Sequence, residues 1–222
     1  MKYFLLTIAV LFTFSINGQY RKSDLEKYKA KYGVKILGGY VNLRPETTYV
    51  GNERDQIVHQ IALTDATPQM AIGLWGQKRF GWLYAEGNIL YSHYGMNFDV
   101  TTYMIENIQT RRMQENFGYL DLQIMGGVIS NGFRLAVGPV MHLLVNQNSE
   151  LTTLSNYNQK LRDVSYGFSV GIGYDIGRFS FDLKYDKAFR TIGDHIYYRY
   201  KKSQFLETPD SITFSIAYAI FY

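Results

Sequence analysis

Histidine and serine side chains are the first residues in this chain to examine for chemistry. The histidines are spread widely, at positions 59, 93, 142 and 195. Their spacing fits no helical zinc motif, and a chain without cysteine has no thiolate ligand or thiol nucleophile. Ser92 precedes His93, but neighbours in a strand point to opposite faces, which is poor geometry for a nucleophile and its base. We therefore predict no enzyme, metal site or cofactor; a lipid-modifying enzyme is the alternative.

Charged residues on predicted strands form a more informative set. They carry both signs and share the less apolar face of their strands: Glu86, Asp121, Arg134, Asp175, Asp182, Lys184 and Asp186. Because buried charges need partners, this pattern predicts a salt-bridged network that fills a narrow interior. The alternative is a narrow ion path lined by the same charges.

The strands that must position these residues follow from composition and alternation. The chain is 46% hydrophobic with a mean hydropathy of −0.18, and after residue 18 no apolar run approaches the ~20 residues of a spanning helix. Alternation predicts eight strands, over 33–43, 69–77, 81–93, 116–129, 133–145, 164–176, 178–189 and 211–222. Most exceed the ~5–6 residues of ordinary strands and match the ~9–11 of a strand that crosses a bilayer.

The predicted connections alternate in length. Short links fall around 77–80, at 130–132, where Asn131-Gly132 is a strong hairpin signal, and at Gly177. The long, polar links are 44–68, 94–115, 146–163 and 190–210. This asymmetry is typical of outer-membrane barrels, with short periplasmic turns and long extracellular loops.

The two faces of the strands differ in volume. In 164–176, 178–189 and 211–222, large apolar residues alternate with Gly, Ser, Ala and charged residues. The interior of an eight-stranded barrel is just wide enough for side chains to fill, so the large apolar face must point outward, toward lipid. Strand 33–43 is ambiguous because Lys35 and Leu37 share a face, and Gly138-Pro139 suggests a bulge in mid-strand. Aromatic residues near strand ends could form interfacial girdles: Trp82, Phe133, Tyr166, Phe179, Phe189 and Phe214.

The N-terminus has the pattern of a secretory signal peptide over residues 1–18, with basic Lys2 before an apolar stretch. Residues 19–32 form a charged periplasmic lead-in, and 33–222 form one barrel domain. The formal net charge of +4 is mild, so we expect no nucleic-acid partner.

The final strand ends Phe214-Ser-Ile-Ala-Tyr-Ala-Ile-Phe-Tyr222. Its alternating residues resemble the C-terminal insertion signal of outer-membrane barrels: Phe214, Ile216, Tyr218, Ile220 and Tyr222. With the signal peptide and eight strands, the chain resembles small outer-membrane β-barrel families of the PorT-like or general Bacteroidetes type. The resemblance implies residence in the outer-membrane bilayer and insertion by the barrel-assembly machinery.

The sequence thus predicts an all-β, eight-stranded, antiparallel transmembrane β-barrel. We expect a structural or interaction protein of the outer membrane with secretion or cell-envelope partners, and a PorT-like role in secretion is the sharper form of this hypothesis. A small-solute channel and a lipid A-modifying enzyme are the alternatives.

Overall fold

The computed structural model describes residues 29–42, 47–51, 57–103, 108–154, 157–161, 163–189, 193–198, 201–203 and 210–221. The predicted signal peptide, most of the predicted lead-in and Tyr222 lie outside the described residues. The described chain is almost entirely β-strand, with a short 3-10 helix, η2 (Glu150–Thr153). None of its helices is long and apolar enough to cross a membrane.

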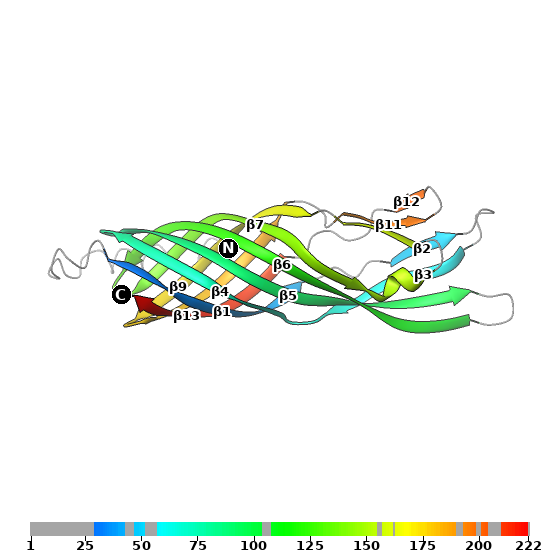
Figure 1. Cartoon of the computed structure of the whole chain (residues 1–222), viewed down its shortest axis with the longest axis horizontal. Helices are drawn as coiled ribbons and strands as arrows, with labels where there is room; N and C mark the ends of the chain where they lie inside the picture. Colours follow the sequence, from blue (N-terminus) through cyan, green and yellow to red (C-terminus); the bar gives the residue numbers. More distant parts are fainter. Residues whose placement is uncertain are drawn as a thin grey trace, which may run out of the picture.

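Eight strands form a closed antiparallel ring, wrapped obliquely around the long axis of the molecule (Figure 1). They are β1 (Ala30–Asn42), β4 (Gln69–Phe80), β5 (Leu83–Tyr103), β6 (Ile108–Ser130), β7 (Phe133–Ser149), β9 (Val164–Ile176), β10 (Phe179–Ala188) and β13 (Asp210–Phe221). Each pairs with the next, and β13 pairs back onto β1 from Tyr32↔Phe221 to Asn42↔Asp210. The eight strands expected from the sequence are confirmed, although β1 begins at Ala30 instead of Gly33.

Tight turns join neighbouring strands at one end of the ring, which we call the turn end; the opposite end is the loop end. Gly81, Asn131, Gly132 and Gly177 in these turns have positive φ values of 67°, 49°, 85° and 57°. Such angles favour glycine or asparagine. The first turn is Gly81-Trp82 and not 77–80 as expected, because β4 continues to Phe80.

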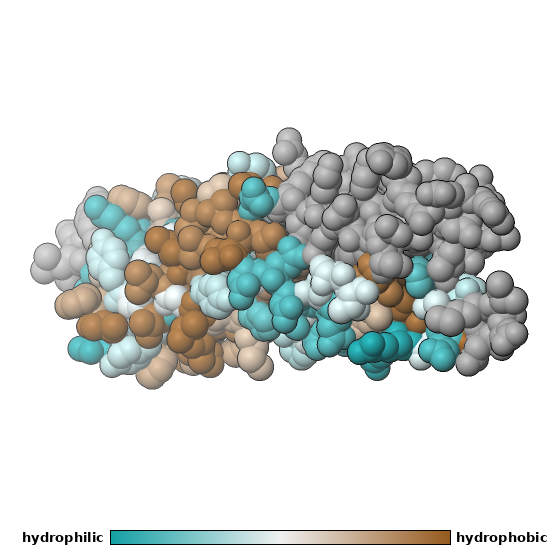
Figure 2. All heavy atoms as spheres, turned by 45° about the vertical axis from the view of Figure 1, so that its right-hand side comes forward, coloured by the Kyte–Doolittle hydropathy of each residue, from teal (hydrophilic) through white to brown (hydrophobic). Residues whose placement is uncertain are grey.

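Side chains alternate strictly between the interior and the exterior of the ring. On β13, Ser211, Thr213 and Ser215 are buried, while the exposed residues Ile212 and Phe214 alternate with them. The other strands repeat this pattern over the ring, and hydrophobic side chains gather on the surface toward the turn end (Figure 2). The prediction that the large apolar face points outward is confirmed. All six residues of the expected aromatic girdles are exposed.

Beyond the ring, the loop end carries additional strands. β3 (Ile57–Ala66) pairs with the far half of β5, and β2 (Thr47–Gly51) pairs with β3. A separate sheet contains β8 (Tyr157–Leu161), β11 (Gly193–Tyr198) and β12 (Lys201–Ser203). The ranges expected to be long connections therefore contain much strand. In the range 94–115, β5 and β6 run on together to the pair Tyr103↔Ile108.

Pro139 does not create a bulge. The β6–β7 pairs Gln123↔Val140 and Gly126↔Val137 are in the same register on either side of Pro139, and pairing with β9 continues through Pro139↔Phe168. The hydrogen-bond ladder between β7 and β6 is interrupted here because proline lacks the N–H that would face β6. No extra residue is inserted at the interruption.

Gly138 provides the close approach of β7 to β6 at this interruption. A Cβ at Gly138 would lie only 1.9 Å from the carbonyl oxygen of Ile124. We expect Gly138→Ala to lower the free energy of unfolding by about 1–3 kcal/mol, since the β6 backbone must shift. Gly126→Ala is the matched control, because a Cβ there meets nothing within 4 Å. Urea unfolding of both refolded variants tests this, and equal stability would contradict it.

Candidate functional site

Glu86 on β5 is the centre of a buried cluster of charges inside the ring. Lys35 of β1 places its Nζ 2.8 Å from Glu86 Oε1, and Lys184 of β10 places its Nζ 2.9 Å from the same oxygen. Arg134 of β7 donates from Nη1 to Glu86 Oε2 at 2.9 Å. Cations from three strands therefore converge on one carboxylate, which the alternation of each strand directs inward.

Arg134 extends this cluster to two further carboxylates. Its Nη2 donates to Asp182 Oδ1 at 2.6 Å, and its Nε lies 3.0 Å from Asp175 Oδ1 without aiming its N–H at that oxygen. Its Cζ lies 5.5 Å from the centre of the Tyr84 ring. The Arg134 side chain is fully buried, so protein groups replace its hydration.

The resulting charge network is balanced. We define it as three cations and three anions: Lys35, Arg134, Lys184, Glu86, Asp175 and Asp182. Lys35 Nζ also lies 3.0 Å from Asp182 Oδ2, so it bridges two carboxylates as Arg134 does. Ions in a low-dielectric interior are tolerated when they are paired and hydrogen-bonded, and here each carboxylate has a cation within 3.0 Å.

Neutral side chains complete the hydrogen bonding around the network. Asn88 donates from Nδ2 to Glu86 Oε1 at 2.9 Å and to Gln123 Oε1 at 3.3 Å. Ser180 donates from Oγ to Asp175 Oδ1 at 2.7 Å. These contacts hold the carboxylates in fixed orientations and close the network on several sides.

Lys35 is the member of the network that the sequence prediction missed. Its position is settled by the exposed neighbours Val34 and Ile36, which place Lys35 on the inner face of β1. A signal for it existed, because the predicted set contained five acids and only two bases. An interior with that excess of negative charge requires another cation.

Asp121 and Asp186 face the interior as well but lie outside this network. Asp121 pairs with His142 on β7, whose Nδ1 lies 2.6 Å from Asp121 Oδ1. The His142 and Tyr119 rings are nearly perpendicular, with centroids 6.3 Å apart and an interplanar angle of 77°. Asp186 is buried on β10. Of the seven predicted charged residues, five therefore belong to the network, Asp121 contacts His142, and Asp186 interacts with Ser169 and with Lys184 without a direct ion pair.

The other histidines are distributed over the molecule. His59 lies in β3 and not in a long connection; its Nδ1 is 3.0 Å from Thr102 Oγ1, and burial lowers the pKa of its ring. His195 lies in β11. His93 is exposed on the outer face while Ser92 is buried, so these two side chains point apart.

Toward the loop end, apolar side chains fill the mouth of the ring above the charges and continue along the inner face of β3, β5 and β6 beyond it. This loop-end core contains Val41, Ile61, Leu63, Tyr94, Met96, Phe98, Val100, Met113, Phe117, Tyr119 and Leu151. The Tyr94 ring lies 5.7 Å from both Phe117 and Tyr119, and it stacks on Tyr119 with an interplanar angle of 11°. In the described part of the chain, two layers of different chemistry thus lie across the interior.

The last strand presents the residues of the expected insertion signal on its outer face. Ile212, Phe214, Tyr218 and Ile220 are exposed on β13, Ile216 is partly exposed, and Tyr222 lies outside the described residues. The Tyr218 ring is 5.1 Å from Phe179 on the neighbouring strand β10.

Comparison with known proteins agrees with this architecture. The family model described as outer membrane protein beta-barrel domain matches residues 7–193. No curated protein matches the chain. The matched segment covers most of the sequence, including seven of the eight ring strands in full, and the family implies residence in the outer membrane. The chain therefore belongs to the family of outer membrane proteins with a β-barrel domain.

Proposed function

We propose that this outer-membrane barrel spans the bilayer as a sealed structural or interaction protein. The observation that carries the proposal is the filled interior, in which the charge network and the loop-end core lie one above the other. Eight strands leave no room for an aqueous channel unless such side chains rearrange.

The outward apolar band has the height of a bilayer core. On β13 it extends from Ile212 to Ile220, which is about 26 Å along the strand and about 20 Å along the barrel axis at the usual strand tilt. An apolar exterior of this size needs lipid around it. The turn end would then face the periplasm and the loop end the outside.

The part that extends beyond the band provides a surface for partners. β5 continues from Tyr91 to Tyr103, about 40 Å along the strand, and β6 accompanies it. The outer face of this extension is polar; for example, the Tyr103 hydroxyl donates a hydrogen bond to Gln60 Oε1 at 2.7 Å. We call the sheet of β2, β3 and the far halves of β5 and β6 the outer platform; the loop-end core stiffens it.

Planar-bilayer recording tests whether the lumen is sealed. We expect no stable open channels from the refolded wild-type protein, since the network would have to separate its charges. Long-lived channels that are abolished by substitution of Arg134 or Asp182 would instead support the narrow-channel function. A lipid A profile that changes on deletion of the protein would support an enzyme.

A PorT-like role in secretion is the sharper form of the interaction hypothesis, and family resemblance motivates it. Co-purification of the tagged protein from cross-linked cells should then recover secretion components. Normal secretion by a deletion strain would exclude this role and leave the interaction function to other envelope partners.

A further inference from the structure

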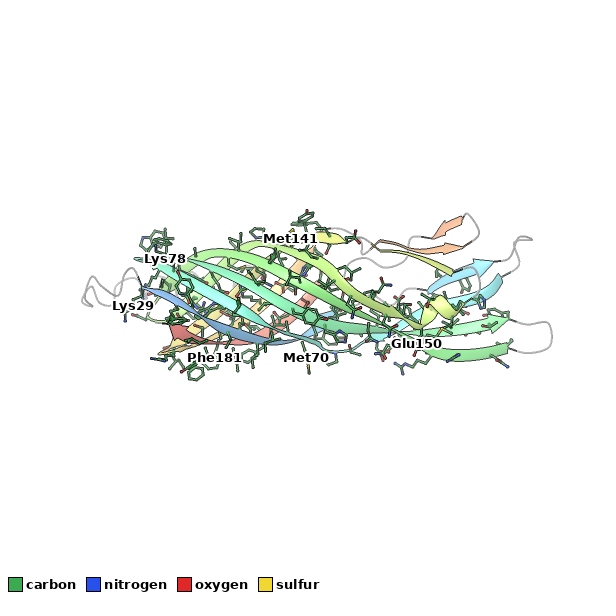
Figure 3. The ribbon with its side chains drawn as sticks, viewed as in Figure 1. Lys29, Met70, Lys78, Met141, Glu150 and Phe181 are labelled. Atoms are coloured by element: carbon green, nitrogen blue, oxygen red, sulfur yellow. The ribbon has the colours of Figure 1, made fainter. Side chains whose placement is uncertain are left out.

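Cations gather at the turn end of the ring. Five basic residues lie in or beside the turns and strand ends there, and we call them the basic rim: Lys29, Lys31, Lys78, Arg79 and Arg178. Figure 3 places Lys29 and Lys78 together at this end. The acidic residue described beside them is Asp175, whose Oδ2 lies 3.3 Å from Lys31 Nζ. Within the described ranges, the rim therefore holds more cations than acids.

The loop end has no comparable excess among the described residues. Two exposed cations there have an acid beside them: Arg112 lies 2.5 Å from Asp65, and Lys187 lies 3.7 Å from Asp210. The hydrogen bonds from Asn97 and, to a smaller extent, Arg112 hold the pKa of Asp65 below its usual value. Among the residues that the structure describes, the excess of positive charge thus lies at the turn end.

Two rim cations lie among aromatic residues on the outer surface. Lys78 is on the outward face of β4, exposed, with its Nζ 5.4 Å from the centre of the Phe80 ring. Arg178 is exposed in the β9–β10 turn before Phe179, and Trp82 is 66% exposed in the β4–β5 turn. Aromatic rings and long cationic side chains at one level are the pattern of a membrane interface, where the cations reach toward headgroups.

We infer that the two exposed cations of the basic rim, Lys78 and Arg178, bind the phosphates of anionic phospholipids in the leaflet at the turn end. The inference rests on the proposed membrane span, which puts this level at the headgroups. A phospholipid surface fits better than a soluble acidic protein, because Lys78 and Arg178 project beside the apolar band, on different sides of β1 in the ring. A lipid whose chain lies on the band can present its phosphate to either cation.

The test measures which lipid the full-length protein retains. The barrel is refolded into vesicles of equimolar phosphatidylcholine and phosphatidylglycerol, extracted in mild detergent and analysed by native mass spectrometry. We expect preferential retention of phosphatidylglycerol that weakens with added salt. Removing a cation near an anionic surface should reduce the preference about fivefold. The double variant Lys78→Gln/Arg178→Gln should therefore lose most of it.

The matched control is Arg111→Gln/Arg112→Gln, which removes two exposed cations of β6 at the loop end, beyond the apolar band. It should leave the preference unchanged. Equal retention of both lipids by the wild type, or an equal loss in the control, would overturn the inference while leaving the proposed span intact. Failure of the wild type to float with the vesicles would overturn both. Salt dependence provides a wild-type test even if the double variant folds poorly.

Discussion

Arg134→Met is expected to lower the free energy of unfolding by about 3–5 kcal/mol, because it leaves buried carboxylates without their cation. Arg134 contacts Glu86 at 2.9 Å and Asp182 at 2.6 Å, and its side chain is fully buried. Methionine has a similar length, so the loss comes from charge and not from a large cavity. Urea unfolding in detergent micelles, followed by tryptophan fluorescence, measures the change.

The control for this prediction is Arg178→Met, which removes an exposed arginine from a turn. Its expected effect is below about 0.5 kcal/mol. Adding Asp182→Asn alone to Arg134→Met should recover part of the loss, since two cations then face two carboxylates and Lys35 and Lys184 keep Glu86. A change below about 1 kcal/mol for Arg134→Met alone would contradict the view that the charges act as one unit.

Phe117→Ala should have an effect of similar size at the other end of the interior. Phe117 is fully buried and its ring centroid lies 5.7 Å from that of Tyr94 and 6.2 Å from that of Tyr119. Truncation of a buried phenylalanine costs about 3–5 kcal/mol. Because the loop-end core supports the outer platform, we expect faster proteolysis of β5 and β6 beyond the ring, measured by limited digestion and mass mapping.

Ile108→Ala provides the comparison, since Ile108 lies at the end of the same strand and is 64% exposed. This variant should be cut at the wild-type rate. If Phe117→Ala were also cut at that rate, the loop-end core would not be what keeps the outer platform rigid.

Sequence alternation predicted the ring well where both faces have a consistent character. On β9, β10 and β13 the outer residues are large and apolar, and the inner ones are small or charged, so volume alone determines the orientation. Lys35 was ambiguous because its inward neighbour Leu37 is apolar, and both are buried. A pattern within one strand could not place Lys35, whereas the charge balance of the whole interior could.

The extension of β5 and β6 was missed for a different reason. Met96, Phe98 and Val100 point inward, but the polar residues Asn97 and Asp99 alternate with them. The outer face of this part of β5 is polar. A search for strands with large apolar outer faces therefore does not detect it. The partners of the interior charges depend on contacts across the ring, which no local pattern contains.

The pairing of β13 with β1 has a consequence for the order of folding. All the other neighbours in the ring are also consecutive ring strands along the chain, whereas this seam joins Tyr32 to Phe221. Bringing such distant residues together has the largest loop-closure entropy of any pairing in the ring. The seam is therefore expected to form last, so that an open, hairpin-built sheet precedes the closed wall. Lys35 is on β1, and its ion pair with Asp182 would lock the interior only when that seam closes.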